Sequence, residues 1–582
     1  GPVWVGVLAL AIVPWGGRPA IDTLPTAAHY LLRQVTGQTE YRARPSSPRP
    51  AGTLALPGDA AALRFHVAEE CGAVMVHDPH AQTLTAIAHV RHPAYVLLSP
   101  DEQARRVAGW GRALAGLAAS GTCARIQVLE VAMPDSGEGI TSWWKSQGNQ
   151  DRRYWTVRQY KELLRTYAPA ASSHRTLIAL ALAMKGASRP IRDAGRGVRG
   201  AAAVLRQEMT AFESGLQAAE LQLAGWLDER ELASTLRATY APTARGPVCN
   251  GGSGPPLEIS GPVAVEEHWD HLRHDNGYSA VLWISEWPRV EVPSFFLHAL
   301  VFAPGIRKTV SITATPLSTA QAMRDIRKAK VEYVTDAAQK ARIGSIADLS
   351  DAKELSDVLD RESALIGGHA DIRFTGLIAV TAGTKDQLDS ALSQIERAAT
   401  QSGCETRRLF GQQARAFTAA ALPLARKVGG TVAEIKTHAS AFYSSRAGGR
   451  LARRSHRMAA KRLMGESRAT LMTTRKAALA QERAERKLNA FLPAGGEPGP
   501  AALRSARRFR IQSHRATSEV LAGAYPFLVE AGLGSEATFI GQDAWSGGSL
   551  CFDPWVLYRK GLLTNPNCLP ARVVGTGEPY LA

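Results

Sequence analysis

The sequence predicts an α+β protein in which two β-β-α-β-containing units are separated by a mainly helical region. Three observations support this fold class. Short apolar alternations bounded by turn residues indicate strands, apolar stripes at helical spacing indicate helices, and both patterns occur twice in the same order. The chain of 582 residues has room for three or four domains of ~150 residues each.

The composition describes a globular and strongly basic chain. Hydrophobic residues make up 45% of it, and its formal net charge is +17. This balance favours an acidic partner such as anionic lipid or nucleic acid. The six cysteines are far apart and form no C-x-x-C pair, so a zinc knuckle and a thioredoxin-type pair are excluded and a reducing compartment is the simplest interpretation.

Residues 1–50 are predicted to form a membrane-proximal segment. The run Val3–Trp15 is apolar and almost uncharged, but it is shorter than the ~20 residues that a membrane span needs. We expect it to be a truncated transmembrane helix, because the charged n-region and cleavage site of a signal peptide are missing; a buried strand or helix is the alternative. Arginines outnumber acids up to residue 50, so the positive-inside tendency predicts a cell-membrane protein with most of its chain in the cytoplasm.

Residues 51–135 are predicted to be the first α+β unit. Apolar runs between Val74 and Val90 flank an Asp-Pro turn and indicate a hairpin. A helix is expected after Ser99, because this capping residue is followed by Pro100 and by two acids in the first turn. The segment Arg125–Val131 returns to strand. The apolar stripe of the helix consists of Val107, Trp110, Leu114 and Leu117.

Residues 136–250 are predicted to be mainly helical, and the Gly- and Pro-rich run Cys249–Pro256 indicates a linker. Residues 257–425 are predicted to be the second α+β unit. Its last helix is expected after the capping residue Thr384, with Gln387 at the capping-box position. No residue-level repeat relates the two units. The strands expected in the second unit are 278–284, 308–315, 372–381 and 405–409.

Segment 426–500 is predicted to be a basic helical linker. Between Arg426 and Lys487 it holds sixteen Lys and Arg residues against four Glu, which is +12 of the net charge. Such a segment can contact the phosphates of DNA or an anionic lipid surface, where each basic residue contributes about 1 kcal/mol. A solvated helical connector is the alternative. The candidate residues for this contact are Arg450, Arg453, Arg454, Arg457, Lys461 and Arg462.

Three histidines, His268, His271 and His274, form an H-x-x-H-x-x-H pattern that invites a metal site. No regular helix or strand brings all three side chains to one face, so we expect no metal there. His77 and His80, which lie in the Asp-Pro turn, are likewise expected not to bind a metal. The sequence holds no H-E-x-x-H or G-x-S-x-G motif, so no catalytic residue is assigned.

Residues 501–582 are predicted to be the incomplete start of a P-loop α/β domain. A phosphate loop needs Gly for close approach of backbone N–H groups, Lys for the outer phosphates and a hydroxyl for magnesium. Here Arg572 stands at the first Gly position, and Glu578 and Pro579 replace the Lys and the hydroxyl residue. We therefore expect neither nucleotide hydrolysis nor a bound cofactor, and a chance Gly turn is the alternative. The degenerate nucleotide-binding residues are Gly575, Thr576 and Gly577.

Three stretches before this turn carry a resemblance: Tyr525–Phe527 (YPF), Cys551–Tyr558 (CFDPWVLY) and Leu563–Asn567 (LTNPN). They resemble the run into the P-loop of the actinobacterial relatives of the type IV secretion assembly ATPase, the motor of conjugative elements. In that family D-P-W-x-L-Y and T-N-P-N directly precede the phosphate loop. The resemblance covers residues 505–582 and implies that ATP and magnesium bind in an intact parent protein.

A second set of motifs spans residues 14–424 and includes Pro14–Pro19 (PWGGRP), Val76–Pro79 (VHDP), Trp283–Arg289 (WISEWPR) and Arg407–Gln413 (RRLFGQQ). These motifs resemble the companion membrane protein of the same actinobacterial conjugation loci. That family is similar to the non-motor α+β part of the assembly ATPase, preceded by transmembrane helices, and it implies no catalytic residue. The chain thus resembles a fusion of the companion protein with the beginning of its motor.

The resemblance implies a membrane-associated, non-catalytic scaffold of a conjugative DNA-transfer or type IV-like secretion system, carried on an integrative conjugative element. Its expected partners are the assembly ATPase or other secretion-system subunits, the anionic membrane and DNA. One alternative is a truncated assembly ATPase whose complete parent hydrolyses ATP to drive transfer. A type VII secretion membrane component is a second alternative, against which the D-P-W-x-L-Y and T-N-P-N run argues.

Overall fold

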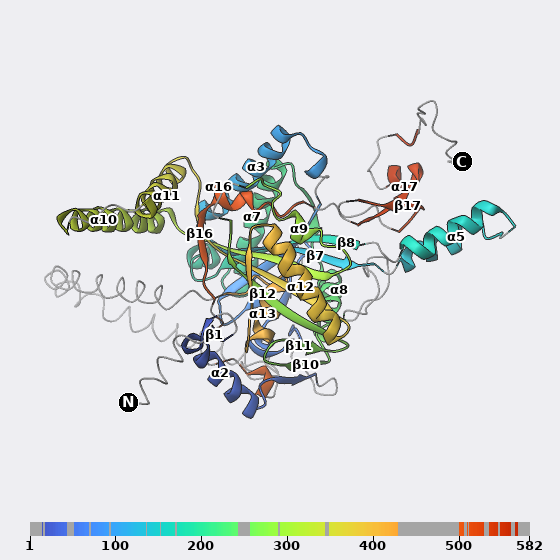
Figure 1. Cartoon of the computed structure of the whole chain (residues 1–582), viewed down its shortest axis with the longest axis horizontal. Coiled ribbons are helices and arrows are strands. Elements are labelled where there is room, and N and C mark those ends of the chain that lie inside the picture. The colour runs from blue at the N-terminus through green and yellow to red at the C-terminus, as the bar shows by residue number, and fades with distance from the viewer. Residues whose placement is uncertain are drawn as a thin grey trace.

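A computed structural model describes residues 14–15, 18–43, 52–68, 71–91, 95–135, 137–151, 153–168, 172–241, 256–288, 292–343, 349–428, 500–503, 505, 509, 511–528, 535–544, 547–559 and 565–567. Its mixed α+β architecture, a large antiparallel sheet with helices on both faces, agrees with the predicted class (Figure 1). Most of the apolar run Val3–Trp15, expected to be part of a transmembrane helix, lies outside these residues. Within them, no helix is long and apolar enough to cross a bilayer.

One 14-stranded antiparallel sheet forms the centre of the molecule. Three further strands pair beside its main path: β9 (Gln222–Trp226) with β6, β15 (Glu405–Arg408) with β12, and β16 (His514–Thr517) with β14. The main path runs β3 (Glu40–Arg42), β10 (Ala264–Glu267), β11 (Leu272–His274), β12 (Gly277–Glu286), β14 (Asp371–Ala382), β13 (Arg307–Pro316), β7 (Cys123–Pro134), β8 (Ser172–Ala183), β6 (Thr83–Arg91), β5 (Val74–Asp78) and β4 (Arg64–Val67).

Eight of the fourteen strands form two units with the same topology. The first runs β6, α3 (Pro100–Ser120), β7, β8, α7 (Gly197–Ala218), β9, with spatial order β9-β6-β8-β7. The second runs β12, α9 (His298–Val301), β13, β14, α12 (Lys385–Gln401), β15, with order β15-β12-β14-β13. Both are therefore β-α-β-β-α-β units with the split, ferredoxin-like strand order, which extends the β-β-α-β order predicted from the sequence.

The two units meet edge to edge through β7 and β13. Seven residue pairs, from Lys308 opposite Ala132 to Ala314 opposite Ile126, form this antiparallel seam. The Gln127 amide donates to the Ser311 hydroxyl at 2.9 Å across the seam. Because equivalent strands pair in opposite directions, the two units are related by an approximate twofold rotation. One continuous sheet results, although the two sequences share no recognisable repeat.

Helix ends follow the predicted local chemistry. Ser99 caps α3 in a capping box with Glu102, and the C-cap of the helix is Gly121, whose φ of +67° suits glycine. Thr384 caps α12 by accepting from the backbone N–H of Gln387. The predicted starts of both helices are confirmed.

The stretch 136–250, predicted to be mainly helical, also contains two strands, β8 and β9. β8 lies at the centre of the first unit, and Leu177–Leu182 is buried on both faces of the sheet. A strand covered on both sides shows no alternation, so its Leu- and Ala-rich run could not be told from a buried helix. The helices of this stretch are α4 (Glu138–Gln147), α5 (Trp155–Tyr167), α6 (Ser188–Asp193), α7 and α8 (Glu229–Tyr240).

Each face of the sheet is covered by its own helices. Alternate residues of β8 point to opposite sides: Ile178 and Leu180 pack in the cluster that includes α3, α7 and α12, whereas Leu177 and Ala179 pack in the cluster under α8 and α13 (Gln413–Ala420). Because both faces carry apolar residues, the sheet forms the middle layer between two hydrophobic cores.

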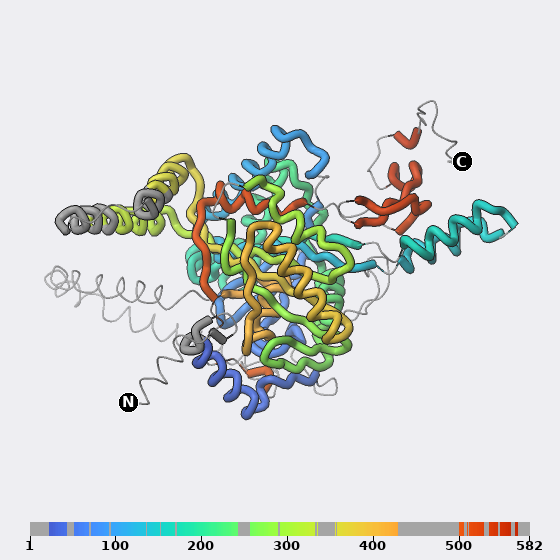
Figure 2. The backbone as a smooth tube through the Cα atoms, viewed as in Figure 1, coloured from blue at the N-terminus to red at the C-terminus, as the bar shows by residue number. Residues whose placement is uncertain are grey.

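A helical pair is inserted at the same point in each unit. α4 and α5 connect β7 to β8, and α10 (Thr319–Ile343) and α11 (Leu349–Ile366) connect β13 to β14. Figures 1 and 2 show these two arms at opposite ends of the molecule. This placement follows from the approximate twofold relation between the units.

The described part of 501–582, predicted to begin a separate α/β domain, is divided between the body and one arm. β16 pairs with β14 of the main sheet, and α16 (Ser518–Gly523), capped by Thr517, packs on α3. Tyr525 and Phe527 are buried in the core beneath α3 and α7. β17 (Thr538–Gln542) and β18 (Ser549–Phe552) then form a hairpin followed by α17 (Pro554–Arg559).

The first helix of the described residues, α2 (Ala20–Val35), is fixed to the second unit. Arg33 forms a buried ion pair with Glu267 of β10, at 2.6 Å, and donates to the carbonyl oxygen of Gly411 at 2.9 Å. Among the described residues, the remaining short elements are β1 (Pro14–Trp15), β2 (Arg18–Pro19) and the 3-10 segments Gly58–Ala62, Tyr95–Leu97, Leu257–Ile259 and Pro500–Ala502.

Candidate functional site

The site residues predicted from the sequence lie outside the described residues. These are the nucleotide-binding candidates Gly575, Thr576 and Gly577, and the anionic-surface candidates Arg450, Arg453, Arg454, Arg457, Lys461 and Arg462. The start of the basic segment is described: Arg426 pairs with the buried Asp78 of β5 at 2.6 Å. This pair lowers the pKa of the Asp78 carboxyl against the opposing effect of its burial. The predicted sites themselves stay predictions.

The D-P-W-x-L-Y run forms a helix start. Asp553 accepts hydrogen bonds from the backbone N–H groups of Trp555 and Val556, at 2.8 and 3.3 Å, and so caps α17. Trp555 and Tyr558 lie three residues apart on this helix and are exposed by 65% and 48%. The aromatic residues of the motif thus lie on the surface of the described chain, rather than in its core.

The α4–α5 arm and the β17–β18 hairpin form a small lobe with its own core, which we call the distal lobe. Ile140 and Leu164 of the arm pack with Phe539 and Cys551 of the hairpin, all buried. The Tyr160 hydroxyl accepts from the backbone N–H of Phe539 at 2.7 Å, and burial raises its pKa to about 12. The hairpin therefore stabilises the arm across almost 400 residues of sequence.

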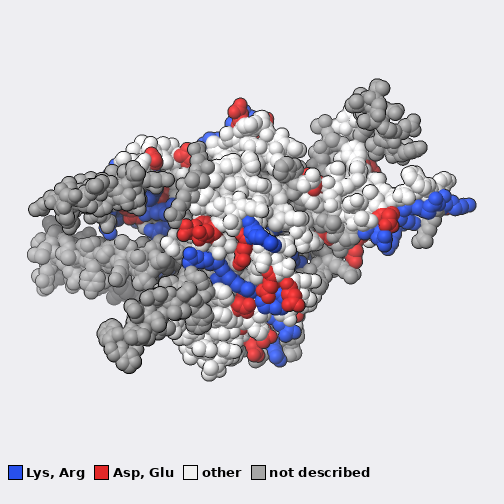
Figure 3. Space-filling view, in the orientation of Figure 1, with Lys and Arg blue, Asp and Glu red and all other residues white. Residues whose placement is uncertain are grey.

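The tip of this arm is aromatic and cationic. Tyr154 and Trp155, at the start of α5, are exposed by 58% and 59%. Arg153 beside them exposes 91% of its side chain, and Lys145 and Arg158 are exposed too. Figure 3 shows the Lys and Arg side chains following the arm outward.

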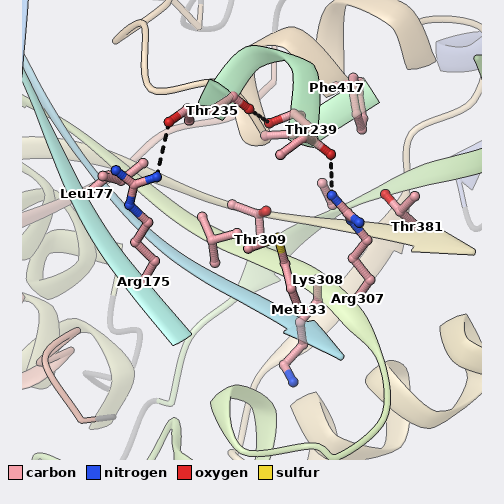
Figure 4. Close-up of a pocket in the computed structure, with 14 residues that line it drawn as sticks. Met133, Arg175, Leu177, Thr235, Thr239, Arg307, Lys308, Thr309, Thr381 and Phe417 are labelled. Atoms are coloured by element: carbon pink, nitrogen blue, oxygen red, sulfur yellow. Dashed lines mark hydrogen bonds between the residues drawn. The ribbon is translucent and has the colours of Figure 1, made fainter. Parts of the chain in front are cut away.

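A cavity of about 40 Å³ lies beneath α8 and α13, where the two units meet (Figure 4). Arg175 of β8 donates to the Thr235 hydroxyl at 3.2 Å, and Arg307 of β13 donates to the carbonyl oxygen of Ala238. Burial lowers the pKa of Arg307 to about 10. The cavity has room for about three ordered water molecules, which its guanidinium and hydroxyl groups can bind.

A buried polar cluster lies on the opposite face of the seam. Glu130 of β7 accepts from the Thr176 hydroxyl at 2.6 Å and lies 3.3 Å from Nδ1 of His174. Lys308 of β13, diagonally across from Glu130, donates to the carbonyl oxygen of Ala303 at 2.6 Å. Burial lowers the pKa of Lys308 to about 8, although the charge of Glu130 opposes this shift. The cluster places ionisable groups from both units within one apolar layer.

Of the three histidines in the H-x-x-H-x-x-H pattern, His274 is buried apart from the other two. His274 is buried: its Nδ1 bonds the carbonyl oxygen of Tyr240 at 2.6 Å and its Nε2 bonds the Ser279 hydroxyl at 2.7 Å. Because a carbonyl only accepts, Nδ1 carries the proton; burial lowers the His274 pKa to about 4. His268 and His271 stack on each other with ring centroids 4.4 Å apart. In the part of the chain that the structure describes, no group of three or more His, Cys, Asp or Glu side chains could hold a metal ion.

Sequence reasoning missed both the arm tip and the seam. Arg153, Tyr154 and Trp155 are adjacent in the sequence, so a run of basic and aromatic residues at a predicted helix start could have indicated the tip. The residues around the cavity and the cluster, such as Arg175 and Arg307, come from strands that are distant in the sequence, and no local pattern indicates that they meet.

The fold defines a class: an α+β protein with two ferredoxin-like units in one antiparallel sheet. Such units carry many unrelated functions, so the topology alone assigns none. No protein-family model matches the chain, and no curated protein sequence matches it.

Proposed function

We propose that this chain is a membrane-associated, non-catalytic scaffold of a conjugative DNA-transfer or type IV-like secretion system. In this role it holds the assembly ATPase or other secretion-system subunits at the cell membrane, with most of its chain in the cytoplasm. The basic segment 426–500 meets anionic lipid or DNA. The motifs before the Gly575–Gly577 turn and across residues 14–424 support this role by their resemblance to proteins of conjugation loci.

The observation that carries the proposal is the pair of arms at opposite ends of one sheet. Helices of the same chain cover both faces of the sheet, within the residues that the structure describes. The arms α4–α5 and α10–α11 extend beyond this body instead (Figure 1). A sheet with a projection at each end suits a protein that holds partners in place.

Excision of the α10–α11 arm tests the proposal. Pro316 and Ile372 lie directly opposite each other on β13 and β14, so a short hairpin turn can replace the residues between them and leave the sheet intact. In a host with the complete conjugation locus, we expect the excised variant to accumulate normally but to lose co-purification with its secretion partners. DNA-transfer frequency should fall at least tenfold.

The matched control is Leu97→Ser, which changes an exposed apolar residue outside both arms. It should leave both readouts unchanged. Normal transfer and co-purification by a folded, arm-excised variant would contradict a scaffold role for this arm.

The alternative, a truncated assembly ATPase, predicts a different result. Binding of Mg·ATP to the purified chain, lost on Gly577→Val, would favour that alternative over the scaffold. The replacement of the P-loop Lys by Glu578 leads us to expect no such binding, because a carboxylate repels phosphate oxygens.

A further inference from the structure

The tip of the α4–α5 arm exposes aromatic rings that the fold of the arm does not need. The inner side of the arm is already packed. Ile140 and Leu164 are buried against the hairpin, and the ring centroids of Trp144 and Tyr160 lie 4.3 Å apart. Tyr154 and Trp155 instead leave more than half of their surface in water. Their exposure therefore requires an explanation other than the stability of the arm.

Cations surround these rings. Arg153 and Lys145 are exposed at the tip, and Arg158 follows one turn after Tyr154. Arg158 donates to the carbonyl oxygen of Arg153 at 3.1 Å, which fixes the backbone at the start of α5. Arg153 pairs with Asp151 at 3.2 Å, so one acid partly balances this group of cations. The net charge of the tip nevertheless stays positive.

Trp and Tyr next to Lys and Arg is the combination that suits a bilayer interface. The amphipathic rings reside at headgroup level, with the apolar part buried and the N–H or O–H in contact with water. Lys and Arg bury their stems and keep their charges among anionic headgroups. We propose that the tip of the α4–α5 arm, residues 145–151 and 153–158, inserts into the headgroup region of an anionic membrane; this inference rests on the proposed membrane-associated function.

The geometry favours a membrane over single-stranded nucleic acid. Tyr154 is the N-cap and Trp155 the first residue of α5, and neighbouring side chains at a helix start point in different directions. Diverging rings cannot stack on successive bases, which requires a roughly parallel series. Both rings can enter a lipid interface at once, because the bilayer adapts to a convex tip.

The arm also has a suitable length. The 13 residues of α5 span about 20 Å, so the tip can reach the headgroups while the sheet stays in water. Figure 1 shows the arm extending away from the sheet and not along it.

The experiment measures amide hydrogen exchange of the full chain with vesicles of phosphatidylcholine and phosphatidylglycerol, and with phosphatidylcholine alone. Vesicles with the anionic lipid should slow exchange at residues 145–158, whereas the zwitterionic vesicles should have a much smaller effect. Unchanged exchange at the tip with anionic vesicles would overturn the inference. Slowed exchange with an oligonucleotide but not with vesicles would overturn it as well, in favour of DNA.

A pair of variants supplies the second readout, partitioning in a vesicle flotation assay. Tyr154→Ser/Trp155→Ser should weaken partitioning about tenfold, since it removes two rings from the interface. Trp555→Ser/Tyr558→Ser on α17 removes the same ring types from another exposed site and should change it less than twofold. Equal effects of the two variants would contradict a specific role of the tip. The exchange experiment on the unaltered chain needs no variant, so a misfolded variant does not affect it.

The two proposals can fail separately. If the tip does not bind vesicles but the chain still co-purifies with its secretion partners, the proposed lipid contact is contradicted and the scaffold proposal is supported. If vesicles protect the tip but the chain co-purifies with no secretion partner, the proposed lipid contact is supported and the scaffold proposal is contradicted.

Discussion

Replacement of Lys308 by Met should stabilise the protein at neutral pH. Only 2% of Lys308 is exposed, and burial lowers its pKa from 10.5 to about 8. Because 1.36 kcal/mol corresponds to each pKa unit, keeping the ammonium charged in the folded state costs about 3 kcal/mol. Met has a similar volume and no charge, but it loses the hydrogen bond to the Ala303 carbonyl, worth about 1 kcal/mol. The expected gain in the free energy of unfolding at pH 7 is therefore about 2 kcal/mol.

The pH dependence gives the sign of the effect. The folded-state pKa lies below the unfolded value, so the unfolded chain binds the proton more tightly. The full cost is present below about pH 8, diminishes between about pH 8 and 10.5, and is absent above. The stability of the wild type should rise relative to Lys308→Met across this window.

Guanidinium unfolding of both proteins between pH 7 and 10.5, with Lys385→Met as a matched control at a more exposed lysine, measures this difference. A Lys308→Met variant that is less stable at pH 7, or a difference independent of pH, would refute the reasoning. The first result would mean that the interaction with Glu130 outweighs the cost of burial, and the second that it balances this cost.

Three further predictions concern other parts of the molecule. Arg33→Ala leaves the Glu267 carboxylate buried without its ion pair, so we expect a loss of about 3–5 kcal/mol in urea unfolding; an unchanged midpoint would contradict this. Phe539→Ala should cost about 3–5 kcal/mol within the distal lobe, seen as faster proteolysis of the α4–α5 arm while the body keeps its melting temperature. Deletion of residues 500–582 removes the buried Tyr525 from the core, so circular dichroism should show a lower melting temperature. A melting temperature equal to that of the full chain would mean that the two units fold stably without this segment.

The elements with distinct local signals were predictable from the sequence. The starts of α3 and α12 follow from the caps Ser99 and Thr384, because capping depends on a few neighbouring residues. The strands β12, β13 and β14 differ from their predicted bounds by only one or two residues, since turn residues and helix starts flank them. β8 was not predictable, because burial on both faces removes the alternation that identifies a strand.

The pairing of the two units through β7 and β13 could not be predicted from any local sequence pattern. The register of β7 on β13 depends on side chains that meet only in the folded chain, such as Gln127 and Ser311. The same limit applies to the cavity and the buried cluster. By contrast, Tyr154 and Trp155 form a local motif, but in a stretch predicted to be helical their exposure could not be inferred without knowing what packs on the arm.

The seam also has a consequence during synthesis. β8 is complete at Ala183, whereas β13 ends at Pro316, so 133 residues are added before the open edge of β7 receives its partner. At ~5–20 residues per second, their synthesis takes about 7–27 s, during which the open edge of β7 can pair with other nascent chains. Arg125, Gln127 and Glu130 interrupt the apolar sequence of β7, and polar residues at such positions discourage intermolecular pairing. In the finished protein Arg125 and Gln127 bond the backbone of Ala425, so two of these polar side chains also help to close the sheet.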